Sequence, residues 1–239
     1  SDCKYAAVIS LDMNTFSIVD LTNGNTVVKT IAPGFMIANV TFSPDNKYIA
    51  VTQIDSWQVF LYDFTTIEQV TYLTGFETAA PVFDAGFSKS PQWIVWKARG
   101  TLQLQEISSG TMGARFEHED FITTYSLSGD GTILATAAAK TVNGNMSPAV
   151  TLWDAVQGNE LITLVFTDPV YTLDFSPNAK MLVVGSAAKL QILDSTSGEL
   201  LTSIEEHSSN ITSVSWSPDG KFIASSGVDN QLILWTVFQ

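Results

Sequence analysis

Trp216-Ser217-Pro218-Asp219-Gly220-Lys221 is the stretch that decides the fold, because the chain repeats it. Pro presets the φ angle that a tight turn needs, and Gly tolerates a positive φ, so the stretch predicts a turn between two strands. The other copies are Phe42–Lys47, Leu127–Thr132 and Phe175–Lys180, with Phe87–Pro91 as a looser one. The serines of the five copies stand at 43, 88, 128, 176 and 217, which indicates a period of about 42 residues.

A second landmark follows the same period. It is an acidic residue that closes an apolar segment, and it occurs at Asp20, Asp63, Glu106, Asp154 and Asp194, with Thr236 in the sixth place. These positions are 43, 43, 48, 40 and 42 residues apart. Two independent landmarks therefore advance together along the chain, in the range of roughly 40–45 residues that is typical of β-propeller blades.

Each period reads as four short strands. In the last one, alternating segments are predicted at Leu200–Ile204, Ile211–Trp216, Phe222–Ser226 and Leu232–Trp235, with turn residues between them. No segment shows helical periodicity over 12 residues. The predicted fold class is all-β: a β-propeller of four-stranded antiparallel blades, because such sheets bury both faces only against neighbours around an axis.

Six blades are expected within one propeller domain spanning residues 1–239. Ser1–Ala7 aligns with Pro44–Ala50, so the first blade is expected to lack its inner strand, and the last blade its outer strand. We expect a natural chain that is longer at its N-terminus, with seven blades if a further repeat precedes; a gapped ring would leave sheet edges free to self-associate. The expected blades are 1–31, 35–74, 82–116, 121–165, 169–204 and 210–239.

The sixth repeat resembles the WD-repeat family. His207, Ser225, Asp229 and Trp235 stand at the places of the four polar residues of that family, and His207 precedes Ser217 by the family's spacing of ten. The resemblance implies a buried hydrogen-bond chain from the indole through the hydroxyl and the imidazole to the carboxylate. The role of such a chain is structural, because the hydroxyl is occupied by the indole and no nucleophile elbow surrounds it.

Other repeats keep fewer of these residues. In the fourth repeat, His118, Thr136 and Trp153 hold three of the four places, without the aspartate. The first repeat is also similar to the YVTN-type surface propellers of prokaryotes, in Asn14–Leu21 and Thr26–Ile31.

Composition narrows the partners. The formal net charge is −13, from 24 acidic against 11 basic residues, which disfavours nucleic acids and anionic membranes and leaves basic partners, or partners without charge, as the more natural ones. No apolar run is long enough to span a bilayer. Two histidines and one cysteine supply no metal cluster, so no metal and no cofactor is expected.

Candidate partner-binding residues lie in the segments that enter each innermost strand and in the turns between second and third strands. Two interpretations of the phenylalanines among them stay open: a hot spot for a peptide, or inter-blade core in the place of the family's histidine. The insertion at 139–149 is expected to be a long loop, either functional or neutral. The candidates are Phe35, Met36, Trp57, Phe76, Glu77, Arg99, Glu119, Asp120, Phe121, Glu205 and Glu206.

The sequence predicts a non-catalytic scaffold that binds a protein or peptide partner through these loops at the mouth of the channel. One alternative is a structural cell-surface or extracellular domain, which self-assembly of the chain would support. The second is a propeller enzyme with a metal or cofactor in the channel, which a melting temperature that depends on metal or cofactor would support. The cytoplasm and the prokaryotic cell surface are both compatible with the sequence.

Overall fold

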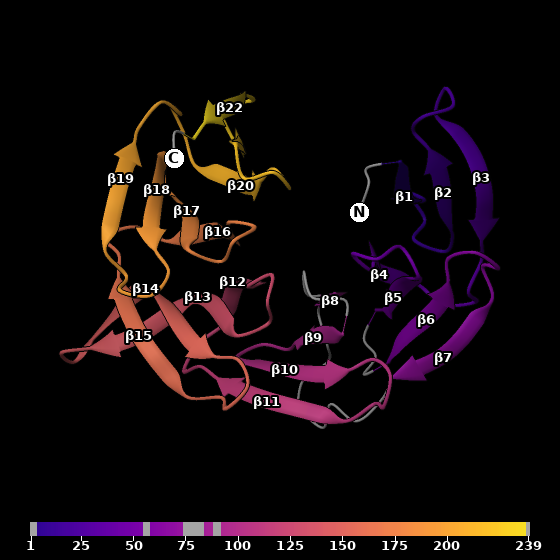
Figure 1. Cartoon of the computed structure of the whole chain (residues 1–239), viewed down its shortest axis with the longest axis horizontal. Coiled ribbons are helices and arrows are strands. Elements are labelled where there is room, and N and C mark those ends of the chain that lie inside the picture. Colours follow the sequence, from indigo (N-terminus) through magenta and orange to yellow (C-terminus); the bar gives the residue numbers. More distant parts are fainter. Residues whose placement is uncertain (1–3, 55–57, 74–83, 88–91, 238–239) are drawn as a thin grey trace. The chain divides into compact units, whose positions relative to one another are not determined.

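Short strands joined by tight turns make up the regular structure of the chain (Figure 1). The computed structural model describes residues 4–54, 58–73, 84–87 and 92–237. Across these ranges all regular structure is β, in 22 strands, and no helix occurs. The chain divides into two compact units, residues 1–113 and 114–239.

The first unit holds the first two sheets and most of the third. The first sheet has the order β1-β2-β3, the second β4-β5-β6-β7 and the third β8-β9-β10-β11. The division between the units falls within β11. The strands are β1 (Tyr5–Ile9), β2 (Phe16–Asp20), β3 (Thr26–Ile31), β4 (Ile37–Phe42), β5 (Tyr48–Gln53), β6 (Val59–Asp63), β7 (Gln69–Leu73), β8 (Asp84–Phe87), β9 (Trp93–Lys97), β10 (Thr101–Glu106) and β11 (Met112–Glu117).

The second unit holds the fourth sheet, β12-β13-β14-β15, the fifth, β16-β17-β18-β19, and the sixth, β20-β21-β22. The all-β fold class is confirmed, with three strands in the first and last sheets and four in the others. The strands are β12 (Ile122–Leu127), β13 (Ile133–Val142), β14 (Asn145–Asp154), β15 (Glu160–Val165), β16 (Val170–Phe175), β17 (Met181–Ser186), β18 (Lys189–Asp194), β19 (Leu200–Ile204), β20 (Ile211–Trp216), β21 (Phe222–Gly227) and β22 (Leu232–Thr236).

The repeated serine organises the turn between the first two strands of a sheet. Ser217 Oγ donates to Asp219 Oδ1 and accepts the backbone N–H of Phe222 at 2.9 Å. The fourth residue of this turn, Gly220, has a φ of 71°. The same contacts recur at Ser43, Ser128 and Ser176, where the residue with positive φ is Asn46, Gly131 or Ala179. The turn is therefore held by local bonds that its own sequence supplies.

The acidic landmark caps the next turn on the same end of the sheet. Asp194 Oδ1 accepts the backbone N–H groups of Thr196 and Ser197 at 2.9 and 2.7 Å, and Asp63 and Asp154 make equivalent pairs of bonds. These bonds hold the pKa of Asp194 below its usual value. One carboxylate oxygen therefore satisfies two backbone donors of the turn.

One backbone hydrogen bond identifies equivalent strands in all six sheets. The residue after the landmark donates its N–H to the carbonyl of the residue that precedes the second strand, as in Phe64 to Lys47 at 2.8 Å. In the first sheet the same bond joins Leu21 to Lys4, directly before β1. The strand β1 is therefore equivalent to the second strand of the other sheets, as the turn alignment predicts.

Burial changes systematically across each sheet. In the four-stranded sheets the second and third strands are largely buried on both faces, as in β5 and β17, whereas outer strands such as β3, β7 and β19 are mostly exposed. Middle strands that are covered on both sides require nearly continuous apolar sequence. This distribution places the cores between consecutive sheets.

Neighbouring sheets of the second unit are joined by side chains of β16. Asp174 Oδ2 accepts the N–H of Trp216 at 2.9 Å, and Thr172 Oγ1 accepts the N–H of Val214 at 3.1 Å. The other oxygen of Asp174 accepts the hydroxyl of Ser126 at 3.3 Å. One carboxylate therefore links β12, β16 and β20, which are the first strands of three consecutive sheets.

The contact between the fifth and sixth sheets leaves no room for a methyl group at Gly185. A Cβ there would lie 2.6 Å from Cγ2 of Thr172 and 2.9 Å from Cγ2 of Ile211. We expect Gly185→Ala to lower the free energy of unfolding by about 1–3 kcal/mol, since overpacking forces neighbours to shift. Urea unfolding measures this, with Gly129→Ala as control, where the nearest atom would be 3.4 Å away. Equal costs for the two variants would contradict the packing described.

The insertion at 139–149 is not a loop, so that expectation was wrong. Strands β13 and β14 remain paired to the tip, where Val142 faces Asn145. Asn143 and Gly144 form the turn with φ values of 54° and 81°. Two successive positive φ angles are the signature of the tight hairpin turn that Asn-Gly favours, and this local signal extends the ladder.

Candidate functional site

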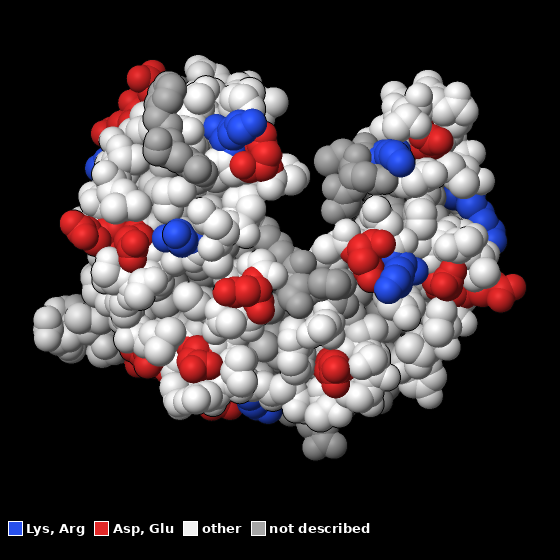
Figure 2. Space-filling view, in the orientation of Figure 1, with Lys and Arg blue, Asp and Glu red and all other residues white. Residues whose placement is uncertain are grey.

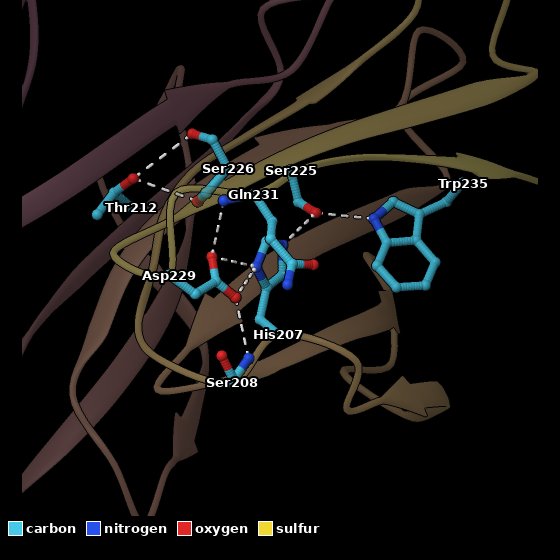
Figure 3. A network of polar contacts seen from close by, with 8 residues as sticks. All are labelled: His207, Ser208, Thr212, Ser225, Ser226, Asp229, Gln231 and Trp235. Carbon is cyan, nitrogen blue, oxygen red and sulfur yellow. Dashed lines mark hydrogen bonds and ion pairs between the residues drawn. The ribbon is translucent and has the colours of Figure 1, made fainter.

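The sixth sheet contains a continuous network of buried polar side chains (Figure 3). Trp235 Nε1 donates to Ser225 Oγ at 2.8 Å, and the same oxygen lies 2.8 Å from His207 Nε2. His207 Nδ1 lies 2.9 Å from Asp229 Oδ2. The four residues come from β21, β22 and the loops before β20 and β22, which the network ties together.

The carboxylate of Asp229 is fixed as the anion of this network. Burial opposes its ionisation, but hydrogen bonds from His207 and from the N–H groups of Gln231 and Ser208 hold its pKa below the usual value. The Ser225 hydroxyl is only 1% exposed and already contacts two side chains. It cannot reach a substrate in solution, so the Ser, His and Asp do not form a nucleophilic triad.

The fourth sheet has a different arrangement at the equivalent places. Trp153 Nε1 donates to Thr136 Oγ1 at 2.8 Å, but Nε2 of His118 is buried without a hydrogen-bond partner among the described residues. The His118 ring packs edge-on against Trp153, with centroids 5.2 Å apart. His118 is therefore outside the hydrogen-bond set in which the sequence places it. The Thr136 hydroxyl donates to the carbonyl of Thr151 at 3.3 Å instead, and Lys140 stands 22 residues after His118, the spacing from His207 to Asp229.

This environment makes acid stability depend on His118. Burial, and then the charge of Lys140, lower its pKa from 6.5 to about 4. The unfolded chain binds the proton below pH 6.5 while the folded histidine stays neutral, so stability falls as the pH drops from 6.5 towards 4. We expect this to cost about 2 kcal/mol at pH 4.5, which His118→Phe removes. Urea unfolding at pH 7 and pH 4.5 measures the difference.

Lys140→Met supplies the control for that prediction. It removes the cation that helps to keep the imidazole neutral, so the acid loss should become smaller while His118 is retained. If the native chain and His118→Phe lose the same stability between the two pH values, the environment described for His118 is incorrect.

The predicted partner-binding segments lie at one end of their own sheets. Turns between the second and third strands, and loops that enter first strands, share an end because the strands are antiparallel. In the first unit, Met36 is 51% exposed and Arg99 is exposed. In the second, Glu119, Asp120, Glu205 and Glu206 are exposed, and Phe121 is 42% exposed. Trp57, Phe76 and Glu77 lie outside the described residues.

The two described phenylalanines among the candidates differ. Phe35 stacks on Phe60 at a centroid distance of 4.4 Å and packs against the core of the first two sheets. Phe121 lines a pocket instead. The contacts of Phe35 therefore fit the interpretation as inter-blade core. Of these two phenylalanines, Phe121 is the one that solvent can reach.

The pocket at Phe121 has a volume of about 230 Å³ and belongs to the second unit. Its wall includes the base of the β13–β14 hairpin and the start of β16. Small or buried residues line the inner part of the pocket. Its accessible part is lined by Phe121 and by Met146, which is 57% exposed. The lining consists of Asp120, Phe121, Thr123, Ala137, Ala138, Ala139, Met146, Ser147, Pro148, Ala149, Pro169 and Val170.

Hydrogen bonds fix the walls of this pocket. Thr123 Oγ1 lies 3.0 Å from the carbonyl of Ala137 and 2.9 Å from that of Val170, so it links the fourth and fifth sheets. Glu119 Oε2 accepts the N–H of Thr141 at 3.2 Å, which ties the hairpin to the loop before β12. The walls of the pocket are therefore held in place by contacts within the chain.

Acidic side chains occur in several separate places on the face seen in Figure 2, and basic ones are fewer. Asp120 belongs to the pocket, Glu119 precedes it, and Asp168 precedes Pro169 of the wall. The nearby cation of the hairpin, Lys140, is engaged with Glu160 at 2.6 Å. The surroundings of the pocket are therefore acidic.

Sequence reasoning missed three features of this region. Met146 and the alanines of the hairpin carry no signal of a pocket, which arises only where the hairpin meets the next sheet. Asp174 links three sheets through space, and Lys140 replaces the expected aspartate. Only Lys140 could have been found, from the repeat spacing. Within the described ranges, no three His, Cys, Asp or Glu side chains are grouped as a metal site, and no helix is suited to crossing a bilayer.

The repeats of the chain are similar to those of known proteins. The family model "WD domain, G-beta repeat" matches residues 158–192 and 198–236. Cross-pathway control WD-repeat protein 2 of Flammulina velutipes is 30% identical over 131 residues, covering 51% of this chain and 39% of that protein. Transcription factor unc-37 of Caenorhabditis elegans is 30% identical over 139 residues, covering 58% and 22%. Protein tipD of Dictyostelium discoideum is 22% identical over 224 residues, covering 90% and 35%.

The chain spans between about a fifth and two fifths of the length of these curated relatives. The second matched segment contains His207, Ser225, Asp229 and Trp235, the four residues of the hydrogen-bond network. The repeated turns and the six antiparallel sheets carry the same organisation through the chain. Residues 158–192 and 198–236 therefore carry repeats of the WD-repeat family, and the sheets of the chain are β-propeller blades.

Proposed function

We propose that the chain is a non-catalytic scaffold that binds a protein or peptide partner through the segments that enter the first strands and the turns between second and third strands. The observation that carries the proposal is the pocket at Phe121, at this end of the fourth sheet. Exposed aromatic and apolar groups beside a rigid hollow are typical of the hot spots at which partners bind.

Similarity to relatives supports the same function. The names of two relatives describe a cross-pathway control WD-repeat protein and a transcription factor. The buried network of the sixth sheet supports a structural role for its serine, histidine and aspartate, which leaves the surface as the place of function.

A random peptide library displayed on phage tests the proposal. Peptides selected on the immobilised full chain are synthesised and their dissociation constants measured for the native protein and for variants. We expect Phe121→Ser to weaken binding about tenfold or more, as loss of a hot-spot aromatic does. Val156→Ser is the matched control, because Val156 is 74% exposed in the turn after β14, at the opposite end of the same sheet.

The proposal predicts that the selected peptides lose affinity when the Phe121 end of the sheet is changed and keep it when the Val156 end is changed. If the selected peptides lose affinity with Val156→Ser and keep it with Phe121→Ser, the proposed surface is wrong. Circular dichroism and thermal unfolding of both variants establish that each retains the native fold, so that a loss of binding reports on the surface.

A further inference from the structure

The size of the pocket limits what it can hold. Its volume of about 230 Å³ is below the ~300–1,000 Å³ that is typical of small-molecule and cofactor sites. It is of the order that suits one large side chain inserted from a partner. The floor explains the space, because Ala137 is buried there on the side of the sheet that faces Val170, and its side chain ends at its Cβ.

The lining determines the chemistry of that side chain. Phe121 and Met146 offer an aromatic ring and a flexible thioether at the accessible side, and both favour apolar contacts. The hydroxyl of Thr123 is already engaged with two carbonyls, and the backbone of the hairpin is paired within its own ladder. Burial of a polar side chain would cost free energy without a compensating hydrogen bond.

The acidic side chains at the margin of the pocket determine which residue is favoured next to the inserted side chain. Asp120 lines the pocket, Glu119 precedes it in sequence, and the one cation of the hairpin is neutralised by Glu160. The protein as a whole has a net charge of −13. A basic residue next to the inserted side chain would therefore gain electrostatic energy, and an acidic one would be repelled.

We infer that this pocket takes one Leu, Met or Phe side chain of a partner peptide that carries Lys or Arg directly beside it. The inference rests on the proposed function and specifies the partner's chemistry at one place. The inserted side chain is the anchor, and the neighbouring cation faces the acidic margin.

Methyl NMR of the methionines tests this with defined peptides. The chain has five methionines, of which Met146 borders the pocket, whereas Met13, Met36, Met112 and Met181 do not line it. Four peptides in a Gly-Ser background pair an anchor, Leu or Ser, with a neighbour, Lys or Glu. We expect the Leu-Lys peptide to shift the Met146 methyl signal saturably, and the Ser-Lys peptide to bind about 10- to 100-fold more weakly.

Three variants test the assignment of the binding site to this pocket. Ala139→Leu adds a side chain to the wall and should abolish the shift of the Met146 signal by filling the pocket. Val156→Leu, which adds bulk at an exposed place on the opposite end, should leave it unchanged. Asp120→Asn should bring the affinities of the Leu-Lys and Leu-Glu peptides closer together, because it removes one negative charge from the margin and keeps the oxygen that accepts the N–H of Phe121.

The outcomes separate this inference from the proposed function. If the Leu-Lys peptide moves the Met36 signal and leaves Met146 unchanged, binding occurs at another predicted segment; the inference falls and the proposed function stands. If all four peptides leave Met146 unchanged while library-selected peptides depend on Phe121, the anchor chemistry is wrong. If Leu-Glu binds as tightly as Leu-Lys at low salt, the electrostatic part is overturned.

Discussion

Replacing Phe175 with alanine is expected to lower the free energy of unfolding by about 3–5 kcal/mol. Phe175 ends β16, is fully buried, and packs in the core that the fourth and fifth sheets share. Its neighbours in that core include Val150 and Leu152 on one sheet and Leu182 on the other. The paired strands around the ring cannot collapse into the space, so the variant loses both the burial of the ring and the contacts around it.

Tyr171 provides the control on the same strand, because its ring is 42% exposed. Tyr171→Ala should cost less than about 1 kcal/mol, as exposed positions usually do. Urea unfolding followed by tryptophan fluorescence measures both variants. If the two substitutions had similar small effects, the sheets would not share a core in the way described.

Replacing His207 with phenylalanine is expected to cost about 2–3 kcal/mol, although the ring is preserved. The variant removes the acceptor that faces the Ser225 hydroxyl and the donor that faces Asp229, both within a site that excludes water. A buried polar group without its partner loses its hydration and gains nothing in return. Chemical denaturation of the native chain and the variant gives the cost directly.

The neighbouring Ser208→Ala should change stability by less than about 0.5 kcal/mol, because Ser208 contacts Asp229 through its backbone N–H, which every residue except proline supplies. A combination of His207→Phe with Trp235→Phe should cost less than the sum of the two, since both residues act through Ser225. Strict additivity would show that the indole and the imidazole are not part of one network.

The fold was accessible from the sequence because its determinants are local and repeated. Ser217 and Asp219 satisfy the backbone of their own turn, and the turn and the acid that closes the third strand each occur five times along the chain at similar spacings. The same spacing brings His207 to Ser225 and Asp229. Where a residue acts on its own repeat, its position in the period is sufficient to place it.

Features that join different sheets could not be inferred in this way. Asp174 accepts hydrogen bonds from β12 and β20, which lie 48 and 42 residues away at their contact points, and nothing in its own repeat distinguishes it from other polar residues. The hairpin tip carried a readable Asn-Gly signal, but the length of the insertion suggested a loop. The pocket at Phe121 depends on how that hairpin packs against Pro169 and Val170, which no single repeat encodes.

Hydrogen exchange of the full chain, with and without a library-selected peptide, tests most directly whether the partner binds at the end of the sheets that carries Phe121. We predict that the peptide slows exchange at residues 119–123 and along the hairpin at 139–149, where the pocket lies. Slowed exchange confined to the turns at 154–160, 194–199 and 217–221, at the opposite end of the same sheets, would contradict the account.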